Sequence, residues 1–441
     1  MTVTVNVGLL GLGTVGTGTA KILLDPAGRH PLVEAINIRR VGVRTLDKPR
    51  GVDLPSGCLT TDLAAIVADP DVDVVVELMG GLEPARSLIL KAIQQGKHVV
   101  TANKAVISRY GDEIFTAANQ AGVYVMLEAA VGGGIPVVQP LKQALGVNRI
   151  HAVTGIVNGT TNYILTRMQE EGGEFETILT DAQRLGYAEA DPTADVDGLD
   201  AADKIAILAS LAFGGRIKLS DVFCEGIRHV SPADIAYAQR LGFVIKLLAI
   251  ARRDTCPLSN ETMDQLQLRV HPTLVPKTHP LASVNGVYNA ILVEGDPLGQ
   301  VMFFGPGAGE GATASAVVSD ILSIAATLQP APQGTTAGSQ NPLLACSHQH
   351  YCDVSPMADI VSRFYVRLLA KDQPGVIGRV GLCFGNHDVS IESVVQIDLR
   401  DDMAEVVVVT HEVKESYFQA ALNELRKFPN IQGVPSVLRV L

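Results

Sequence analysis

A glycine-rich turn near the start of the chain constrains the fold more than any other feature of the sequence. Gly11, Gly13 and Gly16 have the spacing G-x-G-x-x-G and come directly after the apolar run from Val3 to Val7. This run has the pattern of a β-strand, and residues 14–24 have the spacing of a helix with one apolar side. A strand that passes into a helix through such a turn predicts the start of a βαβ unit.

Strands and helices continue to alternate through residues 1–127. The pattern predicts strands over 3–10, 35–43, 73–78 and 97–100, and helices over 14–24, 59–67 and 84–95. The strand at 73–78 is apolar on both faces, which is typical of parallel sheets that helices cover on both sides. The order predicts an α/β protein that begins with a Rossmann-type doubly wound parallel sheet.

The glycine turn also predicts a dinucleotide site. Gly11 permits a tight turn, Gly13 lets the backbone approach a pyrophosphate, and Gly16 lets the helix pack closely on the strand. The helix N-terminus adds free N–H groups and the positive end of its dipole. The expected contacts are Gly11, Gly13, Thr14, Val15 and Gly16. The alternative is a strand–helix turn that binds no ligand.

Two basic residues refine this prediction. An NAD site usually has an acid at the end of the second strand, but Glu34 precedes that strand, which ends at Arg44. Arg44 suits a 2′-phosphate and favours NADP(H) over NAD(H), unless it is a solvated surface residue. Lys104 follows the strand at 97–100, at the edge where doubly wound sheets bind their ligands. We expect it to face the nicotinamide and the substrate; the alternative is a surface lysine that caps a loop.

From residue 128 the pattern changes. Residues 128–136 are too rich in glycine for a regular element. Further on, we expect strands over 150–157 and within 270–304, and helices over 162–170, 200–211 and 314–328. This mixture predicts an α+β domain over residues 128–329, whose last helix, 314–328, packs back on the first domain, 1–127.

The last part of the chain is set off by a biased segment. Residues 330–342 are rich in Pro, Gly, Ser, Thr and Gln and predict an exposed linker, which we place at 330–362. Residues 363–441 then have the order strand, helix, strand, strand, helix, strand. This is the ferredoxin-like βαββαβ order, and a module of this size often needs a partner.

Composition excludes several classes of protein. The chain of 441 residues is long enough for two or three domains, and 35 Lys and Arg against 46 Asp and Glu give a net charge of −11. This acidity argues against nucleic acid as the main partner. No apolar run reaches the ~18 residues of a membrane span, and the N-terminus lacks the basic region of a signal peptide. The six cysteines form no C-x-x-C pair, so we expect reduced thiols in a cytoplasmic protein.

A second unusual stretch crowds carboxylates into a loop that runs into a helix, residues 186–204. Asp200 and Lys204 are four residues apart and therefore share one face of that helix. A surface salt bridge of little energetic value is the alternative. The helix continues as the apolar run 205–211, so we expect it to be buried. A buried lysine among acids is typical of a functional site, and acids suit a substrate ammonium group.

Together these motifs resemble those of homoserine dehydrogenases that carry a C-terminal ACT domain. The motifs are GLGTVG at 11–16, TANK at 101–104, EAAVGGGIP at 128–136, NGTTNYI at 158–164 and GYAEADPTADVDGLDAADK at 186–204. The last is nearly diagnostic, the first is generic, and the resemblance covers essentially the whole chain. It implies an NAD(P)-dependent oxidoreductase that reversibly reduces L-aspartate 4-semialdehyde to L-homoserine, on the route to threonine and methionine.

The resemblance also implies roles for individual residues. Lys204 matches the proton donor to the aldehyde oxygen and Lys104 matches a second active-site lysine, and which of the two delivers the proton stays open. The implied substrate-binding residues are Glu189, Asp195 and Asp200, and the implied further cofactor contacts are Gly186 and Gly309.

A monovalent cation, Na⁺ or K⁺, is implied as well. The matching ligands are backbone carbonyls of Glu128, Val131, Gly133 and Ile135. The three consecutive glycines at 132–134 would let the backbone turn several carbonyls inward. Some relatives carry Ala in place of Gly133, which we expect not to matter if only the carbonyl binds the ion.

Residues 371–378 and 385–391 resemble ACT-domain signatures. ACT domains commonly pair their sheets edge to edge and bind amino acids at the seam, which implies threonine as an inhibiting effector near Gly375 and Asn386. The alternatives are another amino acid or a dimerisation module without a ligand. We expect a homodimer through the sheet of the middle domain, or a homotetramer through the ACT modules.

The sequence disfavours three other functions. A non-catalytic sensor of dinucleotides and amino acids would need neither Lys204 nor Asp200. A semialdehyde dehydrogenase of the same pathway needs a nucleophilic cysteine, and none of the six lies in a glycine-rich loop or at a helix N-terminus. A fused aspartate kinase is excluded by length.

Overall fold

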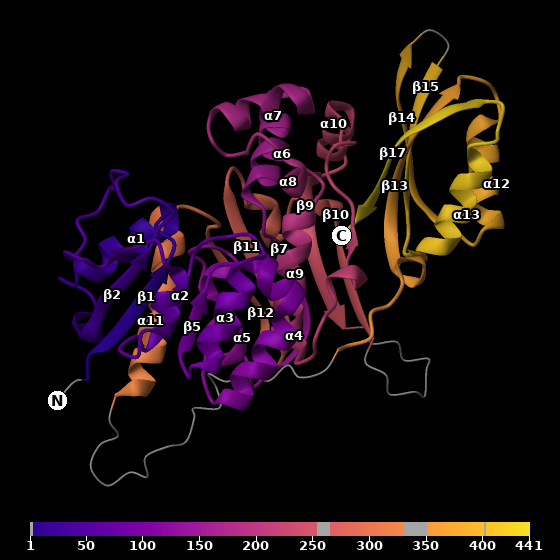
Figure 1. The fold of residues 1–441 in the computed structure, drawn as a ribbon. Coiled ribbons are helices and arrows are strands. Elements are labelled where there is room, and N and C mark those ends of the chain that lie inside the picture. The colour runs from indigo at the N-terminus through magenta and orange to yellow at the C-terminus, as the bar shows by residue number, and fades with distance from the viewer. Residues whose placement is uncertain (1–2, 254–264, 330–350, 401–402) are drawn as a thin grey trace. The chain divides into compact units, whose positions relative to one another are not determined.

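The protein is described from a computed structural model, which covers residues 3–253, 265–329, 351–400 and 403–441. Its internal contacts divide the chain into two units, and each is described by itself (Figure 1). The first unit holds residues 1–153, 203–221 and 289–352, and the second holds 154–202, 222–288 and 353–441. Most of the predicted linker over 330–362 lies outside the described residues.

The first unit contains a six-stranded sheet in the order β3-β2-β1-β4-β5-β6, with parallel pairing between neighbours. Its strands are β1 (Val5–Leu10), β2 (Ile36–Gly42), β3 (Leu59–Thr60), β4 (Val74–Glu77), β5 (His98–Thr101) and β6 (Val125–Met126). Its helices are α1 (Thr14–Leu24), α2 (Leu63–Ala68), α3 (Ala85–Gln94) and α4 (Lys104–Ala121). The predicted doubly wound parallel sheet is confirmed.

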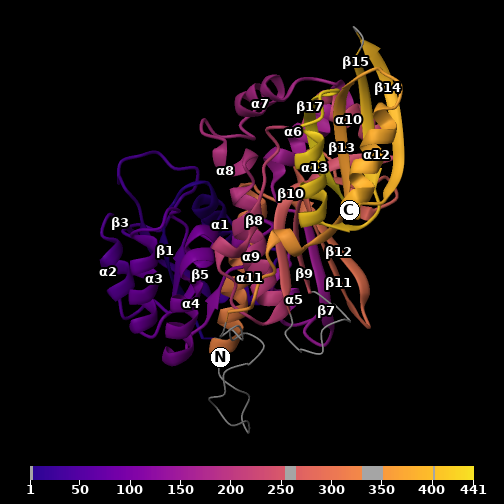
Figure 2. The same cartoon turned by 90° about the vertical axis from the view of Figure 1, so that its right-hand side faces the viewer.

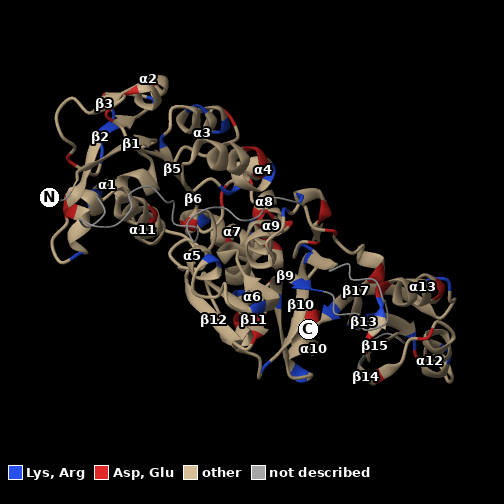
Figure 3. Ribbon diagram, turned by 90° about the horizontal axis from the view of Figure 1, so that it is seen from below, with Lys and Arg blue, Asp and Glu red and all other residues tan. Residues whose placement is uncertain are grey.

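Helices cover both faces of this sheet (Figure 3). α1 and α11 (Glu310–Leu328) lie on one face, and α2, α3 and α4 lie on the other. The strands are therefore apolar on both sides, and Val7, Leu9 and Val76 have no exposed surface.

Helix α11 is, among the described residues, the one helix that is long and apolar enough to cross a membrane by length and composition. Its Val317, Ile321 and Ile324 are buried in the same apolar core as β1 and α1. Gly18 of α1 allows the close approach, because a Cβ there would lie 2.8 Å from the carbonyl oxygen of Glu310. We therefore interpret α11 as a core helix.

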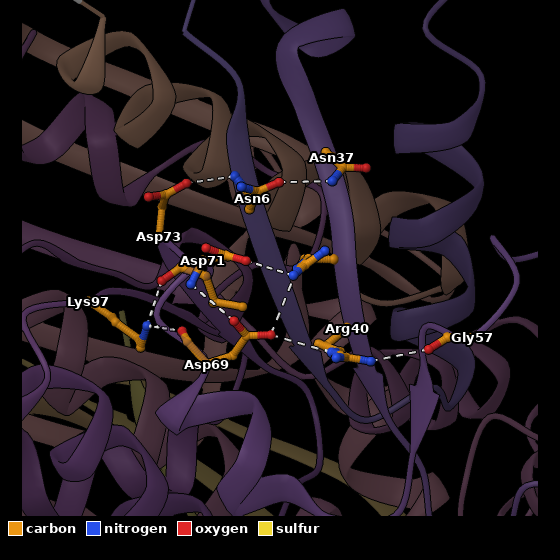
Figure 4. A network of polar contacts seen from close by, with 10 residues as sticks. Asn6, Asn37, Arg40, Gly57, Asp69, Asp71, Asp73 and Lys97 are labelled. Carbon is orange, nitrogen blue, oxygen red and sulfur yellow. Dashed lines mark hydrogen bonds and ion pairs between the residues drawn. The ribbon is translucent and has the colours of Figure 1, made fainter.

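Polar side chains tie the strands of this sheet to the loops beside them (Figure 4). Lys97, just before β5, donates from Nζ to the carbonyls of Asp69 and Val72 at 2.6 and 2.7 Å. Near the start of β1, the N–H of Asn6 donates to Asp73 Oδ2 at 2.8 Å. Side chains therefore satisfy polar groups at the amino ends of β1 and β5, whereas the carboxyl end of β1 leads into the glycine-rich turn.

Several elements lie outside this sheet. The first unit adds α5 (Val138–Lys142), β11 (Tyr288–Asp296) and β12 (Gly299–Pro306), while β7 (Arg149–Ile156) and α9 (Leu199–Phe213) contribute residues to both units. The second unit begins with α6 (Gly159–Glu171), α7 (Phe175–Arg184), α8 (Thr193–Val196), β8 (Phe223–Cys224), α10 (Pro232–Arg240), β9 (Phe243–Arg253) and β10 (Leu266–Pro276).

The C-terminal block has the predicted βαββαβ order. Its elements are β13 (Val361–Lys371), α12 (Val376–Asn386), β14 (Ile391–Arg400), β15 (Met403–Thr410), a short β16 (Val413–Lys414), α13 (Glu415–Leu425) and β17 (Ile431–Val440). Figure 2 shows α12 and α13 side by side on one face of the long strands. Their apolar residues pack there with Phe364, Val366 and Leu368 of β13.

The sheet of this block does not end at its own edge. β17 pairs in parallel with β10, where Thr273 faces Arg439 and Leu274 faces Val440. Within the second unit the strands therefore run in the order β9-β10-β17-β13-β15-β14. The sequence pattern did not predict this pairing, because neither strand carries a signal for its neighbour.

One local prediction was wrong in part, and one helix was not predicted. The helix expected over 59–67 is a short strand, β3, followed by α2, which starts after Asp62 because Asp62 Oδ1 accepts the N–H of Ala65 at 2.9 Å. The unpredicted helix is α4: Lys104 is its first residue, and Asn103 caps it by accepting the N–H of Val106 at 3.2 Å.

Candidate active site

The glycine turn lies between β1 and α1, as predicted. Gly11 has φ +112°, and a Cβ there would lie 2.9 Å from the carbonyl oxygen of Leu78. A Cβ on Gly16 would lie 2.4 Å from the carbonyl oxygen of Gly11. Both positions therefore need glycine for the turn itself.

Gly13, unlike Gly11 and Gly16, has open space where its side chain would be. It is the N-cap of α1, the helix has no side-chain cap, and a Cβ on Gly13 would meet nothing within 4 Å. Gly13 and Thr14 are exposed, and the first-turn N–H groups of α1 lie at the positive end of the helix without a side-chain cap. This arrangement fits the pyrophosphate of a dinucleotide.

Arg44 is exposed and follows β2 by two residues. The loop it belongs to is wrapped around another arginine, since Arg50 Nη1 donates to the carbonyls of Leu46 and Lys48 at 2.8 and 2.7 Å. Sequence reasoning missed Arg50. Its position suggests that it shapes the loop which presents Arg44.

The turn before Lys104 is fixed by buried polar groups. Thr101 Oγ1 donates to Glu77 Oε2 at 2.7 Å, and Glu77 has no exposed surface. Asn103 Nδ2 donates to the carbonyl of Gly81 at 2.7 Å. Lys104 itself is half-buried at the carboxyl end of β5. Glu77 was not predicted, and a charged residue inside an apolar strand is the signal that could have found it.

Lys204 lies in α9, four residues after Asp200, and is half-buried rather than buried as expected. The neighbouring Asp203 accepts hydrogen bonds from Ser108 Oγ at 2.7 Å and Arg109 Nη1 at 3.0 Å. Ser108 and Arg109 belong to α4, the helix that begins with Lys104. Asp203 therefore links the two helices that carry the predicted lysines.

In the second unit, Asn158 brings two of the predicted acids together. Its Nδ2 donates to Asp195 Oδ1 at 2.7 Å and to Asp200 Oδ2 at 2.9 Å. Its Oδ1 accepts the N–H of Thr161 at 2.9 Å and so caps α6. Asn158 and Asp200 are 5% and 8% exposed, so the pair is well sheltered. The sequence predicts no role for Asn158, although it belongs to the motif at 158–164.

Glu189 and Gly186 lie on the loop after α7 and are exposed. Gly186 has φ +77°, and the carbonyl of Glu189 accepts a hydrogen bond from Gln183 at 3.1 Å. The structure thus holds the backbone of Glu189 and leaves its carboxylate outside the Asn158 cluster. Gly309, in the first unit, is the exposed N-cap of α11 with φ +129°.

The predicted cation loop is held by a buried carboxylate. Glu128 accepts the N–H groups of Val137, Val138 and Gln139 at 2.6, 2.7 and 2.7 Å, and burial raises its pKa. Its own N–H donates to Asp320 Oδ2 at 2.7 Å. The Glu128 side chain is therefore structural, and its carbonyl accepts the N–H of Val131 at 3.4 Å.

The loop carbonyls fit a monovalent cation. Among the described residues, no backbone N–H donates to the carbonyls of Val131, Gly133 or Ile135. Gly133 corrects one expectation: it has φ +59°, and a Cβ would lie 2.3 Å from the carbonyl oxygen of Gly307. Ala at this position would therefore clash in this chain, whatever the role of its carbonyl.

In the C-terminal block the two predicted effector residues lie far apart. Gly375 is the N-cap of α12 with φ +86°, and Asn386 is the last residue of the same helix, about 16 Å away at 1.5 Å per residue. A cavity of about 460 Å³ opens beside Gly375, lined by the 371–378 loop together with Gln396, Ala404 and Val406. Asn386 takes no part in it within one chain.

Comparison with known proteins gives one consistent result. The family model "Homoserine dehydrogenase, NAD binding domain" matches residues 11–128, "Homoserine dehydrogenase" matches 136–322, and "ACT domain" matches 364–430. The chain is 65% identical to a homoserine dehydrogenase of Synechocystis, over 99% of this chain and 100% of the relative.

Solved structures agree. A homoserine dehydrogenase of Thiobacillus denitrificans aligns with a TM-score of 0.89 at 40% identity, over 99% of this chain and 98% of the other. A hyperthermophilic archaeal homoserine dehydrogenase in complex with NADPH aligns with a TM-score of 0.61 at 26% identity, over 74% and 98%. The chain therefore belongs to the homoserine dehydrogenases, a family of oxidoreductases, and carries a C-terminal ACT domain.

Proposed function

We propose that this chain catalyses the reversible, NAD(P)-dependent reduction of L-aspartate 4-semialdehyde to L-homoserine, on the route to threonine and methionine. The observation that carries the proposal is the 65% identity to a homoserine dehydrogenase over the full length of both chains. The open Gly13 position at an uncapped helix N-terminus supports the dinucleotide part of it.

The residues proposed to hold the dinucleotide are Gly11, Gly13, Thr14, Val15, Gly16, Arg44, Lys104, Gly186 and Gly309. When bound, its nicotinamide ring supplies or accepts the hydride. NADP(H) is proposed as the preferred form, because Arg44 is exposed next to the end of β2 and a related archaeal structure binds NADPH.

Lys204 is proposed to protonate the aldehyde oxygen as hydride arrives at the carbon, and Lys104 to stabilise the negative charge that develops there. Both are ammonium groups at half-buried positions, where a charge interacts more strongly than in water. The Asp203 link between α9 and α4 would keep both helices in register. The same lysine removes the proton when homoserine is oxidised.

Asp195 and Asp200 are proposed to bind the amino and hydroxyl groups of the substrate, together with Glu189. Asn158 acts as a positioning residue, because its amide donates to one carboxylate oxygen of each aspartate and so fixes the two side chains beside each other. The carboxylates of the cluster suit the substrate ammonium group.

A monovalent cation, Na⁺ or K⁺, is proposed to bind the carbonyls of Glu128, Val131, Gly133 and Ile135. Its role would be to fix the glycine loop.

The ACT domain is proposed to bind threonine beside Gly375, and the bound threonine is proposed to inhibit the enzyme. Asn386 could reach such a site only from a second chain. We also propose that the protein forms a homodimer or a homotetramer and that it acts in the cytoplasm.

The test is homoserine oxidation by the full-length chain, with NADP⁺ and NAD⁺ compared and L-serine as a control substrate. The proposal expects turnover of homoserine, a higher kcat/KM with NADP⁺, and inhibition by threonine. A folded chain that binds the dinucleotide but turns over no homoserine would favour the sensor. Unchanged activity at saturating threonine would remove only the regulatory part.

A further inference from the structure

Three side chains with metal-ligand atoms meet on the helical side of the C-terminal block. Cys383 lies in the last turn of α12, His387 is the C-cap residue that directly follows this helix, and Glu424 lies in the last turn of α13. A thiol sulfur, an imidazole nitrogen and a carboxylate oxygen lie within 4.8 Å of one another. It is the one group of this kind among the residues that the structure describes. Its spacing in the sequence is uninformative, because Glu424 is 37 residues from His387.

We propose that Cys383, His387 and Glu424 form a binding site for a divalent transition-metal ion of the zinc type. Thiolate, imidazole and carboxylate are the ligands that zinc accepts, and three of them leave a fourth position for water. Magnesium and calcium are disfavoured because they take oxygen ligands. This site lies outside the residues proposed for catalysis and for the effector.

The distances suit the three ligands after a small shift. His387 Nε2 and Glu424 Oε2 are 2.8 Å apart and share a hydrogen bond. Two such atoms bound to tetrahedral zinc, at bond lengths of about 2.0–2.1 Å, lie about 3.4 Å apart. The side chains of His387 and Glu424 are 27% and 43% exposed, so they can separate without disturbing the core.

Cys383 forms the closed side of the site. It is 1% exposed, belongs to the apolar core of the block, and donates from Sγ to the carbonyl of Ala421 at 3.5 Å. Burial and the Glu424 carboxylate raise the pKa of this thiol to about 11, so a metal must displace the thiol proton when it binds. Entry is open from the side of His387 and Glu424.

The two helices provide a second, independent reason to expect a cation here. α12 ends at Asn386 and α13 ends at Leu425, so both present their C-terminal turns to the three ligands. These ends carry partial negative charge and favour a positive ion. Because α12 and α13 lie side by side (Figure 2), a bound metal would join their ends and stabilise the block.

The test is a titration of the full-length chain with Co²⁺, followed by the absorption that a thiolate–cobalt bond produces. We expect one strong site per chain, loss of the thiolate band in Cys383→Ser, and binding weakened at least about tenfold in His387→Gln and Glu424→Gln. Cys58→Ser, a buried cysteine of the first unit, and His411→Gln, an exposed histidine of the same block, should bind like the wild type.

A thiolate band that is absent from the wild type, or that survives Cys383→Ser, would overturn the site. Because Cys383 is buried and its replacement could unfold the block, a second measurement uses the partly exposed ligand. Zn²⁺ should raise the Tm of the wild type and of His411→Gln, but not that of His387→Gln. An equal rise in all three chains would also overturn it.

Discussion

The glycine turn of the first unit and the carboxylate cluster of the second are built in opposite ways. The turn is made of backbone, and it needs Gly11 and Gly16 because a Cβ at either would collide with a carbonyl. The cluster is made of side chains, with the Asn158 amide between Asp195 and Asp200. A site built from backbone requires glycines at a fixed spacing in the sequence. A site built from side chains can combine residues from distant parts of the chain.

The same contrast separates the two sheets. The six-stranded sheet is joined mainly by backbone pairing and apolar packing, with the Thr101–Glu77 hydrogen bond between β4 and β5 as a buried polar contact. In the second unit, the Arg367 side chain of β13 points away from the apolar core. There it pairs with Asp234 of α10 and Glu405 of β15, both at 3.1 Å. Arg367 is 7% exposed and Asp234 has no exposed surface. Buried pairs of this kind fix which segments meet, at a desolvation cost.

The largest effect on stability is expected at this pair. Arg367→Met leaves the buried Asp234 carboxylate without its cation and should lower the free energy of unfolding by about 3–5 kcal/mol. The matched control is Arg363→Met on the same strand, whose partner Glu392 is partly exposed and which should cost no more than about 1 kcal/mol. Equal losses in urea unfolding would contradict a special role for the buried pair.

Asn158 should come next. Asn158→Ala removes the cap of α6 and the amide between the two aspartates, so we expect a loss of about 2–4 kcal/mol and a raised KM for homoserine. Asn158→Asp keeps a cap acceptor but adds a third carboxylate, and should raise the KM with a smaller loss of stability. A KM unchanged in both variants would show that the cluster does not meet the substrate.

The glycine turn offers a matched pair. Gly16→Ala should cost about 1–3 kcal/mol, because its Cβ would lie 2.4 Å from a backbone oxygen. Gly13→Ala should change stability by less than about 0.5 kcal/mol and still weaken dinucleotide binding at least about tenfold. Dinucleotide titration and thermal unfolding separate the two effects. Wild-type affinity in Gly13→Ala would place the pyrophosphate elsewhere.

Taken over a single pH unit, the smallest effect on stability is its dependence on pH. Burial, and next the Glu128 carboxylate, raise the pKa of Asp320 to about 8 from its usual 3.8. Between these values the native state holds a proton that the unfolded state has lost, so stability should fall as pH rises, by up to about 1.4 kcal/mol per pH unit. Asp320→Asn should flatten this slope, whereas Asp25→Asn, at an exposed position, should not. Parallel slopes in wild type and Asp320→Asn would contradict the assignment.

Sequence patterns predicted the elements of the first sheet because strand and helix periods depend on local residues. They missed helix α4, although it buries an apolar face that includes Val106, Ile107 and Phe115, because only two residues separate it from β5 and its first residue belongs to the TANK turn. They could not predict that β10 pairs with β17 or that Arg367 meets Asp234, 133 residues away, because such contacts depend on tertiary packing. They also placed Gly375 and Asn386 in one effector site, although these residues lie at opposite ends of helix α12.

The most direct test of the account compares homoserine oxidation by the wild type, Lys204→Ala and the surface control Lys218→Ala. We predict that Lys204→Ala lowers kcat by about 10²- to 10⁴-fold with dinucleotide affinity unchanged, while Lys218→Ala keeps wild-type kcat. A kcat in Lys204→Ala within a few-fold of the wild type would contradict the account and move the proton donor to Lys104 or to water.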